Sequence, residues 1–169
     1  MANFGAPADA VAFTQAYAEQ NHGVIAFLQG FRPVDSVDLG YAFFPAGADF
    51  NRRWLLLNGS PAFINVDDLS LLPRADMLKD SAYAVLRGRF PQIALFDGQR
   101  GLQAMPPTES LPDGGQWFVI DYPLRDQCRA CAVLGYASFR FEFAPGGRLL
   151  GVKFLKVTPA GFKAVSRLP

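Results

Sequence analysis

The chain of 169 residues has few of the side chains that most often perform catalysis, with one histidine and two cysteines. It contains no G-x-S-x-G sequence, the usual marker of a Ser-His-Asp hydrolase. It also lacks G-x-G-x-x-G and G-x-x-x-x-G-K-[ST], so nucleotide-phosphate binding has no motif support. The one histidine, His22, lies in Gln20-Asn21-His22-Gly23, where a residue that ends a helix is expected more often than a general base.

Charged residues are scarce as well, at 18% of the chain, and they nearly balance to a net charge of +1. A protein that neutralises nucleic-acid phosphates needs a basic face, and the sequence shows none. No apolar run approaches the roughly 20 residues that cross a bilayer. The first basic residue is Arg32, so the sequence as written predicts no secretory signal. We expect no nucleic-acid partner and no membrane span. A cytoplasmic and an exported location both remain open, since a leader removed from the sequence would leave the same start.

The two cysteines form a single C-x-x-C motif, Cys128 and Cys131. A redox dithiol, half of a zinc site and a local disulfide share this spacing. A thioredoxin-type dithiol needs a helix after the motif, whereas a β-patterned stretch follows here. A structural zinc site needs four ligands, which one histidine and two cysteines do not supply. The motif therefore favours a structural or adventitious pair at a strand entrance, which would be a disulfide in an oxidising compartment. Unused thiols and thiol–disulfide chemistry are the alternatives, and we expect no metal and no cofactor.

The last third of the chain predicts three long strands, at residues 117–124, 131–143 and 148–157. Apolar residues alternate along them, as is typical of strands with one buried face. A four-residue stretch with two glycines joins the second and third strands, which suits antiparallel pairing. We expect two apolar rows to meet in the core: Phe139, Phe141 and Phe143 on one strand, and Leu150, Val152 and Phe154 on the next.

The rest of the chain predicts shorter elements bounded by glycine and proline. Asn58-Gly59 is a strong hairpin signal. The expected helices span residues 7–19, 24–28 and 77–86. The expected strands span residues 37–44, 54–57, 62–66 and 93–96, with 101–105 pairing back to the last of these and a loop at 106–115.

Together these elements predict an α+β fold in which N-terminal helices pack on a curved, mainly antiparallel sheet that ends in a three-stranded meander. This order of elements is similar in outline to the cone-shaped folds typified by nuclear transport factor 2-like domains. Such folds host both enzymes and non-enzymes, so the resemblance implies no function. We expect one domain over residues 7–159, with a lead-in at 1–6 and a tail at 160–169.

Aromatic residues make up 14% of the chain, which is enough for a large core or for an aromatic pocket. Asp121 interrupts an apolar strand, where it would be either a pocket acid or one half of a strand-end ion pair with Arg125 or Lys153. The candidate ligand-binding residues are Trp54, Trp117, Asp121, Tyr122 and Tyr136.

We interpret the chain as a non-enzymatic binding domain whose aromatic pocket or face takes a small apolar or cationic ligand, or a protein partner. One alternative is a small pocket enzyme that uses Asp121 with a nearby tyrosine as acid and base. The other is a thiol–disulfide protein that uses Cys128 and Cys131. A predicted edge strand at residues 62–66 makes a homodimer a further hypothesis.

Overall fold

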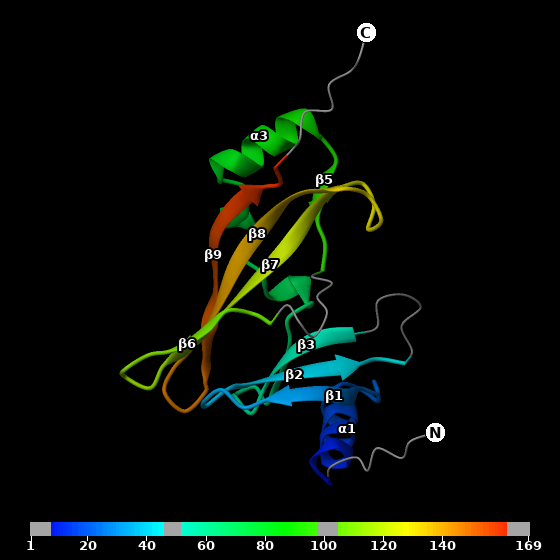
Figure 1. Ribbon diagram of the computed structural model, residues 1–169, viewed down its shortest axis with the longest axis vertical. Helices are drawn as coiled ribbons and strands as arrows, with labels where there is room; N and C mark the ends of the chain where they lie inside the picture. The colour runs from blue at the N-terminus through cyan, green and yellow to red at the C-terminus, as the bar shows by residue number, and fades with distance from the viewer. Residues whose placement is uncertain (1–7, 46–51, 98–104, 162–169) are drawn as a thin grey trace.

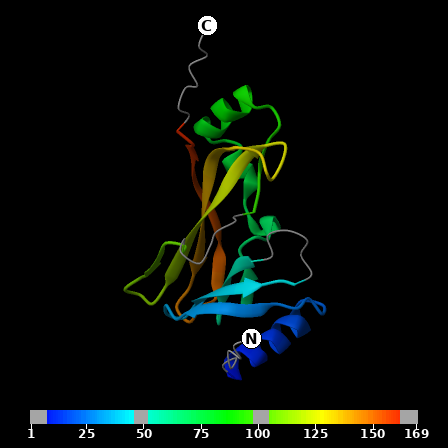
Figure 2. The same cartoon turned by 45° about the vertical axis from the view of Figure 1, so that its right-hand side comes forward.

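The computed structural model describes residues 8–45, 52–97 and 105–161, and it has an α+β architecture (Figure 1). The described residues form a four-stranded and a five-stranded antiparallel sheet, both curled. Figures 1 and 2 show the strands of the first sheet running across those of the second. The predicted lead-in, most of the predicted tail and residues 101–104 lie outside the described residues.

The N-terminal sheet has the order β1-β2-β3-β4 and consists of β1 (Phe27–Arg32), β2 (Asp38–Phe43), β3 (Arg52–Leu57) and β4 (Phe63–Asn65). β2 and the second half of β3 are buried at nearly every position, because both of their faces are covered. Helix α1 (Ala8–Gln20) covers one face, against which Phe13 and Tyr17 pack (Figure 2). The opposite face supplies Leu39, Tyr41 and Leu56 to the main core.

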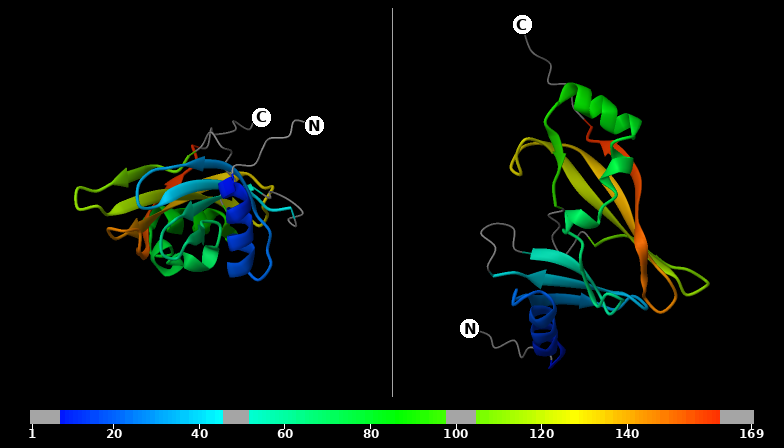
Figure 3. Two further views of the ribbon diagram at one scale, coloured as in Figure 1. Left: turned by 90° about the horizontal axis from the view of Figure 1, so that it is seen from below. Right: turned by 180° about the vertical axis from the view of Figure 1, so that it is seen from behind.

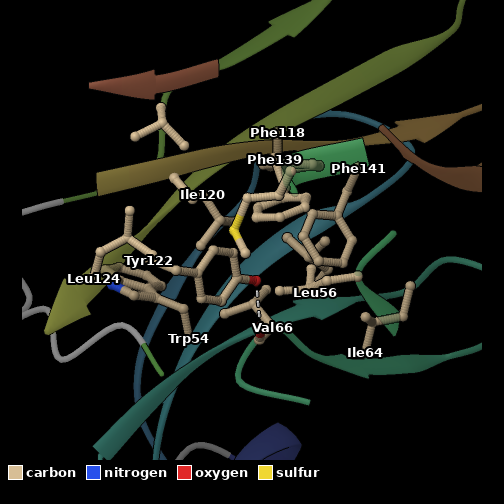
Figure 4. Packing of buried hydrophobic residues seen from close by; sticks show 14 of the residues in the cluster. Trp54, Leu56, Ile64, Val66, Phe118, Ile120, Tyr122, Leu124, Phe139 and Phe141 are labelled. Atoms are coloured by element: carbon tan, nitrogen blue, oxygen red, sulfur yellow. Dashed lines mark hydrogen bonds between the residues drawn. The ribbon is translucent and has the colours of Figure 1, made fainter. Parts of the chain in front are cut away.

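The C-terminal sheet is built on three long strands, β7 (Gln116–Asp126), β8 (Val133–Phe143) and β9 (Leu149–Pro159). Two short strands, β5 (Ile93–Leu95) and β6 (Thr108–Ser110), pair with opposite ends of β7. The inward side chains of β7 and β8 make the centre of the core, as Figure 4 shows. Phe139 and Phe141 are fully buried and Phe143 is 2% exposed, which confirms the predicted apolar row. Burying each such ring contributes roughly 1.5–3 kcal/mol.

Three short helices lie between the sheets in sequence: η1 (Leu69–Leu71), α2 (Arg74–Met77) and α3 (Ser81–Arg89). They pack against the inner face of the C-terminal sheet (Figure 3, right) through Leu72, Met77, Tyr83 and Leu86. Asp80 begins α3 by accepting hydrogen bonds from the backbone of Ala82 and Tyr83, at 2.8 and 3.0 Å.

One buried side chain ties the two sheets together. Gln116 begins β7 and is 1% exposed. Its amide oxygen accepts from the Val37 backbone N–H at 2.9 Å, and its amide nitrogen donates to the Val37 carbonyl at 2.8 Å. The side chain therefore satisfies both backbone groups of Val37, as a neighbouring strand would. Because Val37 leads directly into β2, this pair fixes where the N-terminal sheet begins against the C-terminal one.

Beside this pair, the β3–β4 turn touches the β8–β9 turn. Ser60 donates its N–H to the Gly147 carbonyl at 2.8 Å, and Leu149 donates to the Ser60 carbonyl at 2.9 Å. A Cβ on Gly59 would lie 2.7 Å from the Gly147 oxygen, and one on Gly147 would lie 2.9 Å from the Ser36 oxygen. Both positions therefore require glycine for the turns to approach this closely. We call the contacts of Val37, Gln116, Gly59, Ser60 and Gly147 the sheet junction.

The predicted helix at residues 24–28 is wrong, because this stretch leads into strand β1. A short apolar run does not distinguish helix from strand by periodicity alone. The end of α1 decides the outcome: His22 is in the left-handed conformation with φ 54°, and the Gly23 N–H bonds to the Ala18 carbonyl at 2.8 Å. This arrangement closes the helix before the apolar run begins. The terminal role expected of His22 is thereby confirmed.

Three other predictions need correction. The helix expected at residues 77–86 is divided into α2 and α3, since Asp80 caps a new helix rather than continuing the first one. The loop expected at 106–115 contains β6, which pairs with β7. Bulges in β9 shift the apolar row so that Leu149 packs against the core, whereas Leu150 is 57% exposed.

We predict that Gln116→Met lowers the free energy of unfolding by roughly 2–6 kcal/mol, because each of the two Val37 groups left buried without a partner costs about 1–3 kcal/mol. Urea denaturation measures the change. Gln20→Met, at the exposed end of α1, is the control and should change stability by less than about 0.5 kcal/mol. A Gln116→Met variant as stable as this control would show that the junction does not depend on the amide.

Candidate functional site

A half-open cavity of about 620 Å³ lies between α1 and the N-terminal sheet, and some of its lining residues, such as Phe31, are exposed to solvent. Its size is within the range of small-molecule sites. The rings of Phe13, Phe31 and Phe63, from α1, β1 and β4, lie around it. The other lining residues are Ala12, Ala16, Leu28, Gln29, Gly30, Leu57 and Asn58. We call this space the α1 cavity.

Small residues on α1 leave room for the α1 cavity, and a glycine on β2 lets two of the lining leucines pack close to the sheet. Ala12 and Ala16 are one helical turn apart and therefore lie on the same side of α1. On β2, Gly40 has no side chain, and a Cβ there would lie 2.5 Å from Leu57 Cδ1 and 3.0 Å from Leu28 Cδ1. The two leucines thus occupy the space directly above Gly40.

The α1 cavity has an uncharged lining among the described residues. Its polar side chains are Gln29, whose oxygen accepts from Arg52 at 3.1 Å, and Asn58, whose nitrogen donates to Asp38 at 2.6 Å. Burial raises the pKa of Tyr17, one turn beyond Phe13, and the Arg53 guanidinium offsets this only in part, so the phenol stays neutral at physiological pH. The described lining residues offer apolar contact and amide hydrogen bonds, and none of them is an acid, a base or a nucleophile.

The structure separates the five residues predicted to bind a ligand. Trp54 and Tyr122 are 5% and 0% exposed and belong to the main core. The Tyr122 hydroxyl donates to the Val66 carbonyl at 2.5 Å (Figure 4). Trp117 and Asp121 are half-buried on the outer face of the C-terminal sheet, where Tyr136 is 42% exposed. The five side chains therefore do not line a common cavity.

Asp121 accepts a hydrogen bond of 2.6 Å from Ser138, its cross-strand partner on β8. Tyr122 points to the other face of β7 and cannot share a site with it. The two predicted ion-pair partners have other contacts: Arg125 donates to the Cys131 carbonyl, and Lys153 pairs with Glu142. Of Tyr122 and Tyr136, only Tyr136 shares a face of the sheet with Asp121.

A charge cluster lies on the same outer face, beside a second cavity of about 280 Å³ that Trp117 also lines. Glu142 binds Arg140 at 2.5 Å and Lys153 at 2.6 Å. Burial alone would raise the pKa of Glu142, but the hydrogen bonds from Lys153 and Arg140 together outweigh it and hold the pKa below its ordinary value. The carboxylate is thus ionised and doubly paired, which makes it a structural group.

Cys128 and Cys131 form a disulfide in the loop between β7 and β8. His22 is exposed at the end of α1. Across residues 8–45, 52–97 and 105–161 there is no group of three or more histidine, cysteine or acidic side chains that could hold a metal ion.

Comparisons with known proteins do not assign this chain to a class: no family model matches it, and neither the curated proteins nor the solved structures give a significant match. No helix among the described residues is both long enough and apolar enough to span a membrane.

Sequence reasoning missed the α1 cavity because its aromatic residues come from three elements far apart in the chain. One local signal was present: alanine stands at positions 12 and 16 of an otherwise aromatic helix face, where a filled interface would carry larger side chains. The ligand residues predicted from the sequence lie in the most apolar strands, which place Trp54 and Tyr122 in the core and the other three on the outer face of the C-terminal sheet.

We predict that Glu142→Gln lowers the free energy of unfolding by about 1 kcal/mol at pH 7, because the two cations lose a charged partner. The folded pKa of Glu142 lies below its unfolded value, so this stabilisation is present above about pH 4.5 and is lost as the pH falls through the folded pKa. Urea denaturation of both proteins at pH 7 and pH 3 should show a difference that shrinks on acidification. Glu109→Gln, at an exposed position of β6, is the control. A difference independent of pH would contradict the argument.

Proposed function

We propose that this chain is a non-enzymatic binding domain that holds a small, uncharged, apolar molecule in the α1 cavity. One observation carries the proposal: a cavity of about 620 Å³ with three phenylalanines and no charged residue among its described lining. Sites of this kind bind through apolar burial, and a few polar groups orient the ligand.

The charge pattern around the α1 cavity favours a neutral ligand over a cation. Aromatic faces attract cations, but a desolvated cation gains most where a carboxylate is also near. The acid that contacts the lining is Asp38, and its oxygens already accept from the Val34 backbone N–H at 2.8 Å and from Asn58. The Asn58 amide oxygen, which has no partner among the described residues, offers one acceptor for a ligand hydroxyl or amide.

The wider alternatives have less support. An enzyme based on Asp121 would have to work with Tyr136 alone, on an outer sheet face where Ser138 already binds the carboxylate. The similarity of element order to nuclear transport factor 2-like domains remains a prediction about the finer fold. The homodimer likewise stays a hypothesis; β4, which lies at one edge of the N-terminal sheet, is the strand it would use.

Filling the α1 cavity should weaken binding. We predict that wild-type protein binds N-phenyl-1-naphthylamine, an uncharged apolar fluorophore, in a saturable way, and that Ala16→Leu weakens its affinity at least about tenfold, or 1.4 kcal/mol. The leucine side chain would project from α1 into the space the probe needs. Fluorescence titration gives the affinity, and thermal unfolding with and without probe gives the stabilisation.

Ala84→Leu, the same substitution at an exposed position of α3, is the matched control and should bind like wild type. Non-saturable binding by wild-type protein would contradict the binding function itself. Saturable binding that Ala16→Leu leaves unchanged would instead contradict its location in the α1 cavity.

A further inference from the structure

The Cys128–Cys131 disulfide lies at the surface of the molecule, in the loop that joins β7 to β8. Cys128 is exposed and Cys131 is half-buried. The bond is therefore open to a reagent at one sulfur and more protected at the other. It plays no part in the α1 cavity, which lies against the other sheet.

The fold has little need of this bond. In the chain-entropy account, a cross-link that closes so short a loop stabilises much less than one that closes a long loop. The loop has other ties: Cys128 donates its N–H to the Asp126 carbonyl at 2.8 Å, and Cys131 donates to the Cys128 carbonyl at 3.1 Å. Arg129 also binds Asp97 at 2.9 Å, which holds the loop to the end of β5. The pair can therefore open while the β7–β8 hairpin stays paired.

One cationic side chain binds the backbone of the more protected cysteine. The Arg125 guanidinium donates to the backbone carbonyl of Cys131, and it pairs with no carboxylate among the described residues. Arg129, between the two cysteines, is neutralised by Asp97. A nearby cation stabilises a thiolate and so makes its sulfur a better leaving group.

We propose that Cys128 and Cys131 form a thiol–disulfide exchange site whose substrates are external dithiols. A substrate thiolate attacks the exposed Cys128 sulfur, the S–S bond breaks, and Cys131, whose backbone carbonyl binds Arg125, leaves as the thiolate. The second substrate thiol then displaces Cys128 from the mixed disulfide. Two electrons and two protons pass from the dithiol to the protein, which ends as two thiols while the substrate becomes a disulfide.

The proposal is tested by reducing the intact, folded chain with dithiothreitol at graded ratios of reduced to oxidised reagent. Maleimide labelling followed by mass measurement counts the free thiols. The free thiols of both cysteines should appear together and reversibly, with one oxidised dithiothreitol formed per chain. The near-UV circular dichroism spectrum should stay unchanged. The rate should also be unchanged by urea concentrations below the unfolding transition, because the native loop is attacked directly. A rate that rises with urea in parallel with global unfolding would overturn the proposal and leave the bond purely structural.

Single-cysteine variants test which sulfur is attacked. The thiol left in Cys131→Ser should react with an aromatic disulfide reagent faster than the thiol left in Cys128→Ser, because Cys128 is the more exposed. Arg125→Met should lower the equilibrium constant for reduction several-fold in the dithiothreitol titration, while Arg87→Met on α3 leaves it unchanged. The roles assigned to Cys128, Cys131 and Arg125 would be contradicted by two results together: equal reactivity of the two thiols, and an equilibrium constant for reduction that is the same in Arg125→Met as in wild type.

Discussion

The fold depends most on a buried amide at the junction of two sheets whose strands run in different directions. Gln116 occupies the first position of β7 and gives both of its hydrogen-bonding groups to Val37, at the entrance to β2. Apolar packing between the sheets is strong but has no direction, so it does not by itself choose one relative placement. The two buried hydrogen bonds of Gln116 favour one relative placement of the sheets, because any shift would leave four polar groups without partners. The close glycine turns beside the pair are possible only in that placement.

The candidate binding site follows from this arrangement. Once the inner face of the N-terminal sheet packs on the C-terminal sheet, its outer face needs separate cover, and α1 supplies it with Phe13 and Tyr17. The helix leaves part of this face uncovered beside Ala12 and Ala16, and the uncovered space is the α1 cavity. The large aromatic core and the cavity are thus different parts of the molecule: the first stabilises the fold, and the second is available to a ligand. The disulfide, on the opposite sheet, is independent of both.

The sequence predicted elements best where one strong pattern decided the structure. The alternating phenylalanines were sufficient to predict strand β8, and Asn58-Gly59 was sufficient to predict the β3–β4 hairpin, because period-two burial and turn chemistry are local signals. Prediction failed where a tertiary or capping contact determined the secondary structure, as at residues 24–28 and at Asp80. It also failed for the site, since the rings of Phe13, Phe31 and Phe63 meet only after the sheet has formed. Trp54 and Tyr122 were chosen for the same aromatic character that placed them in the core.

Hydrogen exchange at the backbone amide of Val37 tests the central claim most directly. This N–H has a side chain as its acceptor and lies just outside any strand, so ordinary expectation would class it with fast-exchanging loop amides. If the Gln116 amide fixes the sheets as one cooperative unit, Val37 exchanges only through global unfolding, with the same free energy as the bonded amides of β7 and β8. If Val37 instead exchanges with a free energy several kcal/mol lower, close to that of the exposed Asp35, the two sheets open independently and the account is wrong.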